Sequence, residues 1–167
     1  MPMHADLEPH WLQAESLKAD LLARVTSMPE DVRRTPPKSG EWSPLQVLSH
    51  LLVAERFVTG FASAKSDSKE RRANPVVIGL LCRVLRAGIP LPAPEVMAPG
   101  LTPVSLETLA ADWNQEREKL RNTLAQHSPD EPFGLHPIFG VVTTRQTAGM
   151  LAAHMVYHVK RFPKAAR

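Results

Sequence analysis

Three histidines on two predicted helices have the residue type and spacing that could bind a metal ion. His154 and His158 are four residues apart, so their side chains lie one turn above each other on one helix face. His50 belongs to another predicted helix, on the apolar stripe that includes Val47 and Ala54. All three imidazoles are therefore expected to point into one core, where a divalent cation could bind one nitrogen of each ring.

Two interpretations of these histidines are open at this stage. A neutral imidazole buried without a partner costs about 1–3 kcal/mol, and a shared cation would remove that cost for three rings at once. Three protein ligands leave positions free for water or substrate, which is typical of catalytic metal sites. The alternative is three core histidines that each bond to a carbonyl or hydroxyl group. A His-x-x-x-His spacing is weak by itself, and the His-Glu-x-x-His motif of zinc proteases is absent from the sequence.

The elements that must position the histidines are predicted to be helices. Apolar residues recur with a helical period over residues 6–28, 43–64, 105–124 and 143–162. Ser43 with Gln46, and Thr143 with Gln146, have the spacing of capping boxes, which mark the starts of the second and fourth helices. These four segments predict an all-α fold, a four-helix bundle.

The connections are also informative. Residues 75–87 predict a short accessory helix, whereas residues 65–74 and 128–140 read as loops. Five prolines in residues 89–103 predict a long crossover that is neither helix nor central strand. Residues 116–121 of the third helix carry charges of both signs and are expected to form a solvated outer face.

Composition limits the function classes. The 167 residues are enough for one domain, with 43% hydrophobic and 22% charged residues. A net charge of +3 is weak for nucleic-acid binding, so no nucleic-acid partner is expected. We find no membrane span and no secretory signal, and the lone Cys82 cannot form an internal disulfide. We therefore predict a cytoplasmic protein with no membrane partner.

Two stretches of the sequence resemble a known family. Residues 41–51, Glu-Trp-Ser-Pro-Leu-Gln-Val-Leu-Ser-His-Leu, are similar to the second-helix signature of the DinB-like (DinB/YfiT) superfamily. Residues 136–140, His-Pro-Ile-Phe-Gly, and 154–158, His-Met-Val-Tyr-His, resemble that family's fourth-helix region. The resemblance implies an up-down-down-up four-helix bundle. It also implies a divalent metal, nickel or zinc, bound by His50, His154 and His158, the residues selected above from periodicity.

The resemblance implies several activities without choosing among them. Similar proteins include S-transferases and an isomerase that use a low-molecular-weight thiol, and others described as metal-dependent hydrolases. We therefore expect a metal-dependent enzyme acting on a small molecule, with thiol transfer ahead of hydrolysis, and a non-catalytic metal- or ligand-binding bundle as the alternative. The sequence identifies no catalytic general base. Glu55 faces about 140° away from His50 and is expected to be a surface or helix-pairing carboxylate.

The sequence also leads to expectations about the oligomeric state, residues 65–103 and His136. Neighbouring apolar residues on the first two helices extend beyond one stripe, which predicts a two-fold homodimer through helix faces. The relevant pairs are Trp11-Leu12, Leu21-Leu22, Leu51-Leu52 and Phe57-Val58. In the alternative, a monomer, residues 75–87 would cover part of this surface. The sequence assigns no function to residues 65–103, and His136 is expected to fix the turn into the last helix rather than line the site.

Overall fold

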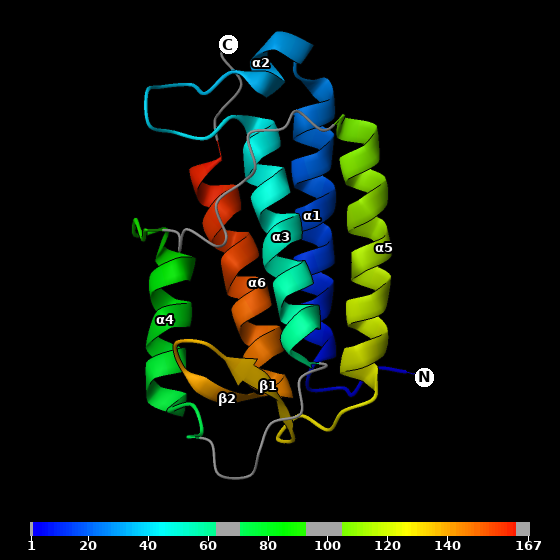
Figure 1. Cartoon of the computed structure of the whole chain (residues 1–167), viewed down its shortest axis with the longest axis vertical. Coiled ribbons are helices and arrows are strands. Elements are labelled where there is room, and N and C mark those ends of the chain that lie inside the picture. The colour runs from blue at the N-terminus through cyan, green and yellow to red at the C-terminus, as the bar shows by residue number, and fades with distance from the viewer. Residues whose placement is uncertain (1, 63–70, 93–104, 163–167) are drawn as a thin grey trace.

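Four long helices run side by side in the computed structural model, which describes residues 2–62, 71–92 and 105–162. They are α1 (Glu8–Ser27), α3 (Pro44–Ala62), α5 (Leu106–Ala125) and α6 (Thr144–Arg161). Figure 1 shows that α1 and α6 run in one direction and that α3 and α5 run in the other. In chain order the helices therefore run up, down, down and up, as predicted.

Capping boxes start the two helices that carry the histidines. The Ser43 amide donates to the Gln46 Oε1 atom at 2.8 Å, and the Gln46 amide donates back to the Ser43 Oγ atom at 3.2 Å. Thr143 and Gln146 form the same reciprocal pair at the start of α6, with distances of 2.9 and 3.2 Å. Each box satisfies two backbone or side-chain groups that would otherwise lack partners, and so sets where the helix begins. Both predicted helix starts are confirmed.

The apolar stripes of the four helices meet in one core. Fully buried side chains come from every long helix: Leu21 and Val25, Leu48 and Leu51, Trp113, Leu120 and Leu124, and Met155. Helix α1 packs against α6 and α3, and α3 packs against α5. The core therefore holds α3 and α6, the two histidine helices, in fixed relation to each other.

The predicted solvated face of α5 is wrong at two positions. Glu116 and Arg117 are buried, with only 5% and 2% of their surface exposed. Arg117 donates from Nε and Nη2 to the two carboxylate oxygens of Glu55 on α3, both at 2.7 Å. The charge run looked solvated because its partner lies 62 residues away on another helix. The same contact shows that Glu55 pairs helices and is not a surface carboxylate.

The accessory helix α4 (Pro75–Ala87) has the predicted bounds. The Asn74 side chain accepts a hydrogen bond from the Val76 amide at 2.9 Å, and Gly88, with φ of 77°, ends the helix in the left-handed region. Helix α4 packs along α6 at the edge of the bundle (Figure 1). Of the predicted proline crossover, only residues 89–92 lie within the described part of the chain.

Two short elements add to the predicted fold. Helix α2 (Glu30–Arg34) lies in the first connection, where the sequence indicated only prolines. Strands β1 (Pro132–His136) and β2 (Gly140–Thr143) form an antiparallel hairpin before α6, in a segment interpreted as a loop. Residues 71–73 of the other predicted loop bond to β2: the Ala73 amide donates to the Val141 carbonyl at 2.8 Å. The hairpin buries Phe133 and Val142 against the bundle, so tertiary packing stabilises strands too short to show a clear period.

Among the described residues, no helix combines the length and the apolar content that a membrane span needs.

Candidate metal centre

His50 reaches the bundle interior from the middle of α3. The capping box at Ser43 fixes the phase of this helix, and Val47 and Ala54, one turn before and after His50, are buried on the same side. His50 is itself buried, with 3% of its surface exposed. The predicted inward orientation of this imidazole is therefore confirmed.

His154 and His158 approach from α6, one turn apart. Their neighbours Leu151 and Met155 are buried in the core, and His158 is buried with them. His154 remains partly accessible to solvent. The pair therefore spans the boundary between the core and a solvent-accessible edge of the bundle.

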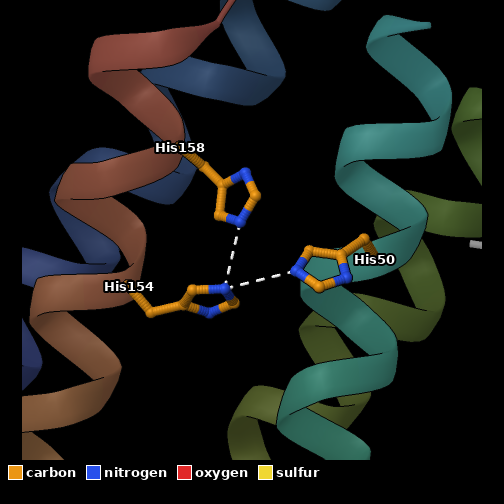
Figure 2. Close-up of side chains that lie close together, drawn as sticks. All are labelled: His50, His154 and His158. Atoms are coloured by element: carbon orange, nitrogen blue, oxygen red, sulfur yellow. Dashed lines mark hydrogen bonds between the residues drawn. The ribbon is translucent and has the colours of Figure 1, made fainter. Parts of the chain in front are cut away.

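The three imidazoles approach one another with their Nε2 atoms. The Nε2 atom of His154 lies 3.2 Å from Nε2 of His50 and 3.0 Å from Nε2 of His158 (Figure 2). One ligating atom from each ring lies within 4.8 Å of the others. The structure thus brings together the three residues selected from the sequence.

Protonation of the two histidines on α6 is disfavoured. Burial, followed by the neighbouring His50, lowers the pKa of His154 to about 3. Burial also lowers the pKa of His158 far below its usual range, with further contributions from His154, His50 and Arg161. Near neutral pH both rings are neutral, which is the form that binds metals.

Neutral rings cannot satisfy this geometry by hydrogen bonding alone. Each neutral imidazole has one N–H group and one lone pair. If Nε2 of His154 carries the proton, it can donate to only one of its two neighbours. If it carries the lone pair, that single lone pair faces two rings. A cation among the three nitrogens would remove the conflict, because each ring would present a lone pair to it.

The donor set and its spacing fit a divalent transition metal. Nitrogens bound at 2.0–2.1 Å in tetrahedral geometry lie about 3.3 Å apart, close to the two distances that His154 makes. Imidazole ligands suit zinc and nickel, and no carboxylate of the described residues joins the cluster. The three histidines would therefore form a neutral donor set that leaves coordination positions open.

Two aromatic residues next to the cluster were not identified as site residues from the sequence. The Trp42 ring lies against His50 with ring centroids 4.8 Å apart, and Tyr157 packs edge-on against His158 at 4.9 Å. The Tyr157 hydroxyl accepts a hydrogen bond from the Leu91 amide at 3.3 Å, which ties the segment after α4 to the site. For Trp42 the sequence did contain a signal. Trp42 directly precedes the Ser43 cap, and an apolar side chain at that position often packs back onto the first turns of the helix.

The other candidate residues lie outside the cluster. His136 ends β1 and packs against Phe139 with centroids 4.6 Å apart, and its Nδ1 atom accepts from the Ile138 amide. This agrees with a role in the turn before α6.

Burial raises the pKa of the half-buried Cys82, so this thiol is not activated as a nucleophile. Arg161 is exposed, lies over the Tyr157 ring, and bonds to the Gly88 carbonyl.

Comparison with known proteins connects this geometry to a family. The sequence model of the DinB superfamily matches residues 13–160, which contain all three histidines. No curated protein sequence matches the chain. Among solved structures, the chain is similar to the crystal structure of TT2238, a four-helix bundle protein, with a TM-score of 0.57 and 19% identity. The alignment covers 93% of this chain and 98% of that one, and at this identity it supports the fold alone.

Proposed function

Since the chain belongs to the DinB superfamily, we propose that it binds a divalent metal ion, nickel or zinc, through His50, His154 and His158. The observation that supports this proposal is the convergence of three Nε2 atoms from α3 and α6, with distances of 3.0 and 3.2 Å to the central His154. Burial disfavours protonation of His154 and His158, so these two ligands are neutral near pH 7 and protons do not compete with the metal for them.

We further propose that the protein is an enzyme acting on a small molecule, of the thiol S-transferase type. A metal ion bound there would lower the pKa of a thiol or water ligand and hold the resulting anion. The three neutral ligands do not cancel the charge of a divalent cation, so this donor set favours an anionic ligand such as a thiolate. Metal-dependent hydrolysis is the alternative, because hydroxide satisfies the same charge requirement.

The chain's own residues would orient the substrate. Trp42 is only partly buried and lies against His50, so it offers an apolar wall next to the ligating nitrogens. Tyr157 packs against His158 and accepts a hydrogen bond from the Leu91 amide, which fixes a second aromatic ring beside the cluster. A small molecule with an apolar or aromatic part beside its reacting atom would match these two walls.

Metal content tests the first part of the proposal. The purified protein and its His50→Ala variant should be compared by elemental analysis after incubation with zinc or nickel and desalting. We expect about one metal ion per chain in the first and a loss of at least tenfold in the second. His136→Ala is the matched control, because His136 lies in the hairpin outside the cluster, and it should retain the metal. Equal metal content in His50→Ala, with helicity unchanged, would contradict the site.

Turnover tests the second part. The metal-loaded protein should be incubated with common bacterial thiols and electrophilic probes, and in parallel with ester and amide probes in the absence of thiol. Metal-dependent conjugation supports thiol transfer, and metal-dependent cleavage supports the hydrolase. Stoichiometric metal with neither reaction favours a non-catalytic binding protein.

A further inference from the structure

Helix α4 exposes apolar side chains on the side away from the bundle. Val76 and Leu80 are one helical turn apart and are 77% and 60% exposed, and the adjacent Val77 is 46% exposed. We call these three residues the outer α4 face. Ile78 and Leu85 are buried on the opposite side of the helix, so packing against the bundle does not account for the outer residues.

Two more exposed apolar side chains follow the end of the helix. Ile89 and Leu91 are 51% and 40% exposed. Most of the other large apolar side chains exposed in the described residues are scattered over α1, α2 and the hairpin. A concentration of five along one short segment is the kind of surface that marks an interaction site.

The same segment is positively charged. Residues 71–92 contain four arginines and no aspartate or glutamate. Arg83 follows Leu80 by three positions and Val76 by seven, so it lies on the side of the outer α4 face. No carboxylate in residues 2–62, 71–92 and 105–162 forms an ion pair with Arg71, Arg72, Arg83 or Arg86. Arg86 donates to the Gln13 Oε1 atom on α1 at 3.0 Å and so faces the bundle. Arg83 is therefore the charge placed on the outer α4 face that an anionic partner could contact.

We propose that the outer α4 face docks on an anionic lipid surface. Exposed aliphatic side chains can enter the boundary between headgroups and acyl chains, while Arg83 beside them binds a lipid phosphate. Nucleic acid would use the arginines but gain little from Val76 and Leu80, and a second copy would bring a second positive segment against the first. This docking is peripheral, in line with the absence of a spanning helix among the described residues. It departs from the expectation from sequence that the protein has no membrane partner.

Vesicle sedimentation tests this proposal on the full chain. We expect binding to vesicles of phosphatidylcholine with 40% phosphatidylglycerol at low salt, and at least tenfold weaker binding to phosphatidylcholine alone. The double variant Val76→Asp/Leu80→Asp should lose at least tenfold in affinity for the anionic vesicles. Arg83→Gln should weaken binding several-fold, and high salt should weaken the binding of the unmodified protein.

Val32→Asp is the matched control, because Val32 is 41% exposed on α2 and not on α4. This variant should bind as the unmodified protein does, and circular dichroism should show equal helicity in all variants. No binding to anionic vesicles at low salt would overturn the proposal, as would an equal loss in the control. A double variant that halves the mass in light scattering would assign the face to a second copy instead. Tight binding of duplex DNA that depends on Arg83 and not on Leu80 would assign it to nucleic acid.

Discussion

Arg117 on α5 and Glu55 on α3 form a bidentate ion pair in the interior of the bundle. Both side chains are almost fully buried, and two nitrogens of the guanidinium contact the two carboxylate oxygens at 2.7 Å. The guanidinium also contacts Glu15 at 3.0 Å and lies over the Trp11 ring, 5.2 Å from its centroid. These contacts join α1, α3 and α5, and so help to set the position of α3, the helix that carries His50.

Removing one partner of this pair should be strongly destabilising. Arg117→Leu leaves the Glu55 carboxylate buried without its cation, and the free energy of unfolding should fall by about 3–5 kcal/mol. Chemical denaturation followed by circular dichroism measures the change. Glu55→Leu combined with Arg117→Leu should recover part of the loss, because no unpaired charge remains.

A second ion pair between the same helices provides the control. Arg56 and Asp112 also join α3 to α5, at 2.8 Å, but their side chains are 49% and 43% exposed. Arg56→Ala should therefore change the free energy of unfolding by less than about 1 kcal/mol. An effect as small as this in Arg117→Leu would show that the buried pair does not stabilise the fold.

Local signals in the sequence predicted the fold and the histidine cluster well. The Ser43 and Thr143 caps set the helix starts, and helical periodicity placed His50, His154 and His158 on inward faces. These features depend on residues a few positions apart, which a sequence reveals directly.

Features that depend on distant residues were not predicted. The burial of Arg117 depends on Glu55, which lies on α3. The periodicity of α5 gives no information about a partner on another helix. The β1–β2 hairpin depends on packing of Phe133 and Val142 and on pairing of β2 with residues 71–73, in a segment with many turn-forming residues. Trp42 lies outside the helical period, and its place before the Ser43 cap indicates packing on the helix but not the contact with His50.

Metal binding should stabilise the folded protein through the three histidines. A ligand that binds only the native state raises the free energy of unfolding, by about 2.7 kcal/mol at 100 times its dissociation constant. Zinc or nickel should therefore raise the melting temperature of the chelator-treated protein by several degrees. His158→Ala should show no such rise, whereas His136→Ala should behave as the unmodified protein does. A rise of equal size in His158→Ala would place the metal elsewhere.

The metal-free protein should lose stability as the pH falls below about 6.5. In the unfolded chain His154 takes up a proton near that pH, whereas in the folded protein burial holds its pKa at about 3. Between these values the unfolded state binds more protons, so acid favours unfolding by up to about 1.4 kcal/mol per pH unit for this group. Above pH 6.5 His154 is neutral in both the folded and the unfolded state, so its contribution to the free energy of unfolding no longer changes with pH.

Denaturation of the metal-free protein at pH 7.5, 6 and 5 measures this dependence. His154→Leu removes the imidazole while keeping apolar volume, so its free energy of unfolding should fall less steeply over the same range. Identical slopes in the two proteins would mean that His154 does not titrate differently in the folded and unfolded states.

Gly140 should be intolerant of a side chain. Its φ is 86°, and a Cβ atom added there would lie 2.1 Å from the Arg71 carbonyl oxygen, a backbone atom that cannot easily move. The left-handed conformation and the clash together should make Gly140→Ala less stable by at least about 2 kcal/mol. Gly79→Ala is the opposite case, since nothing lies within 4 Å of its added Cβ atom in α4. That substitution should stabilise the protein by up to about 1 kcal/mol. Chemical denaturation of both variants tests whether the free energy of unfolding falls in Gly140→Ala and rises in Gly79→Ala.

Fewer exposed apolar residues support the predicted homodimer than the sequence indicated. Leu21, Leu51 and Leu52 are buried within a single chain, so they do not supply the surplus apolar surface that the sequence indicated. Leu12 on α1 is 58% exposed and remains the clearest candidate for a helix-face contact. We expect light scattering at micromolar concentration to give twice the chain mass of 18.5 kDa, and Leu12→Glu to give the monomer. Val76→Asp/Leu80→Asp should leave the dimer intact, because its face is assigned to lipid. A mass near 18.5 kDa for the unmodified protein would refute the dimer.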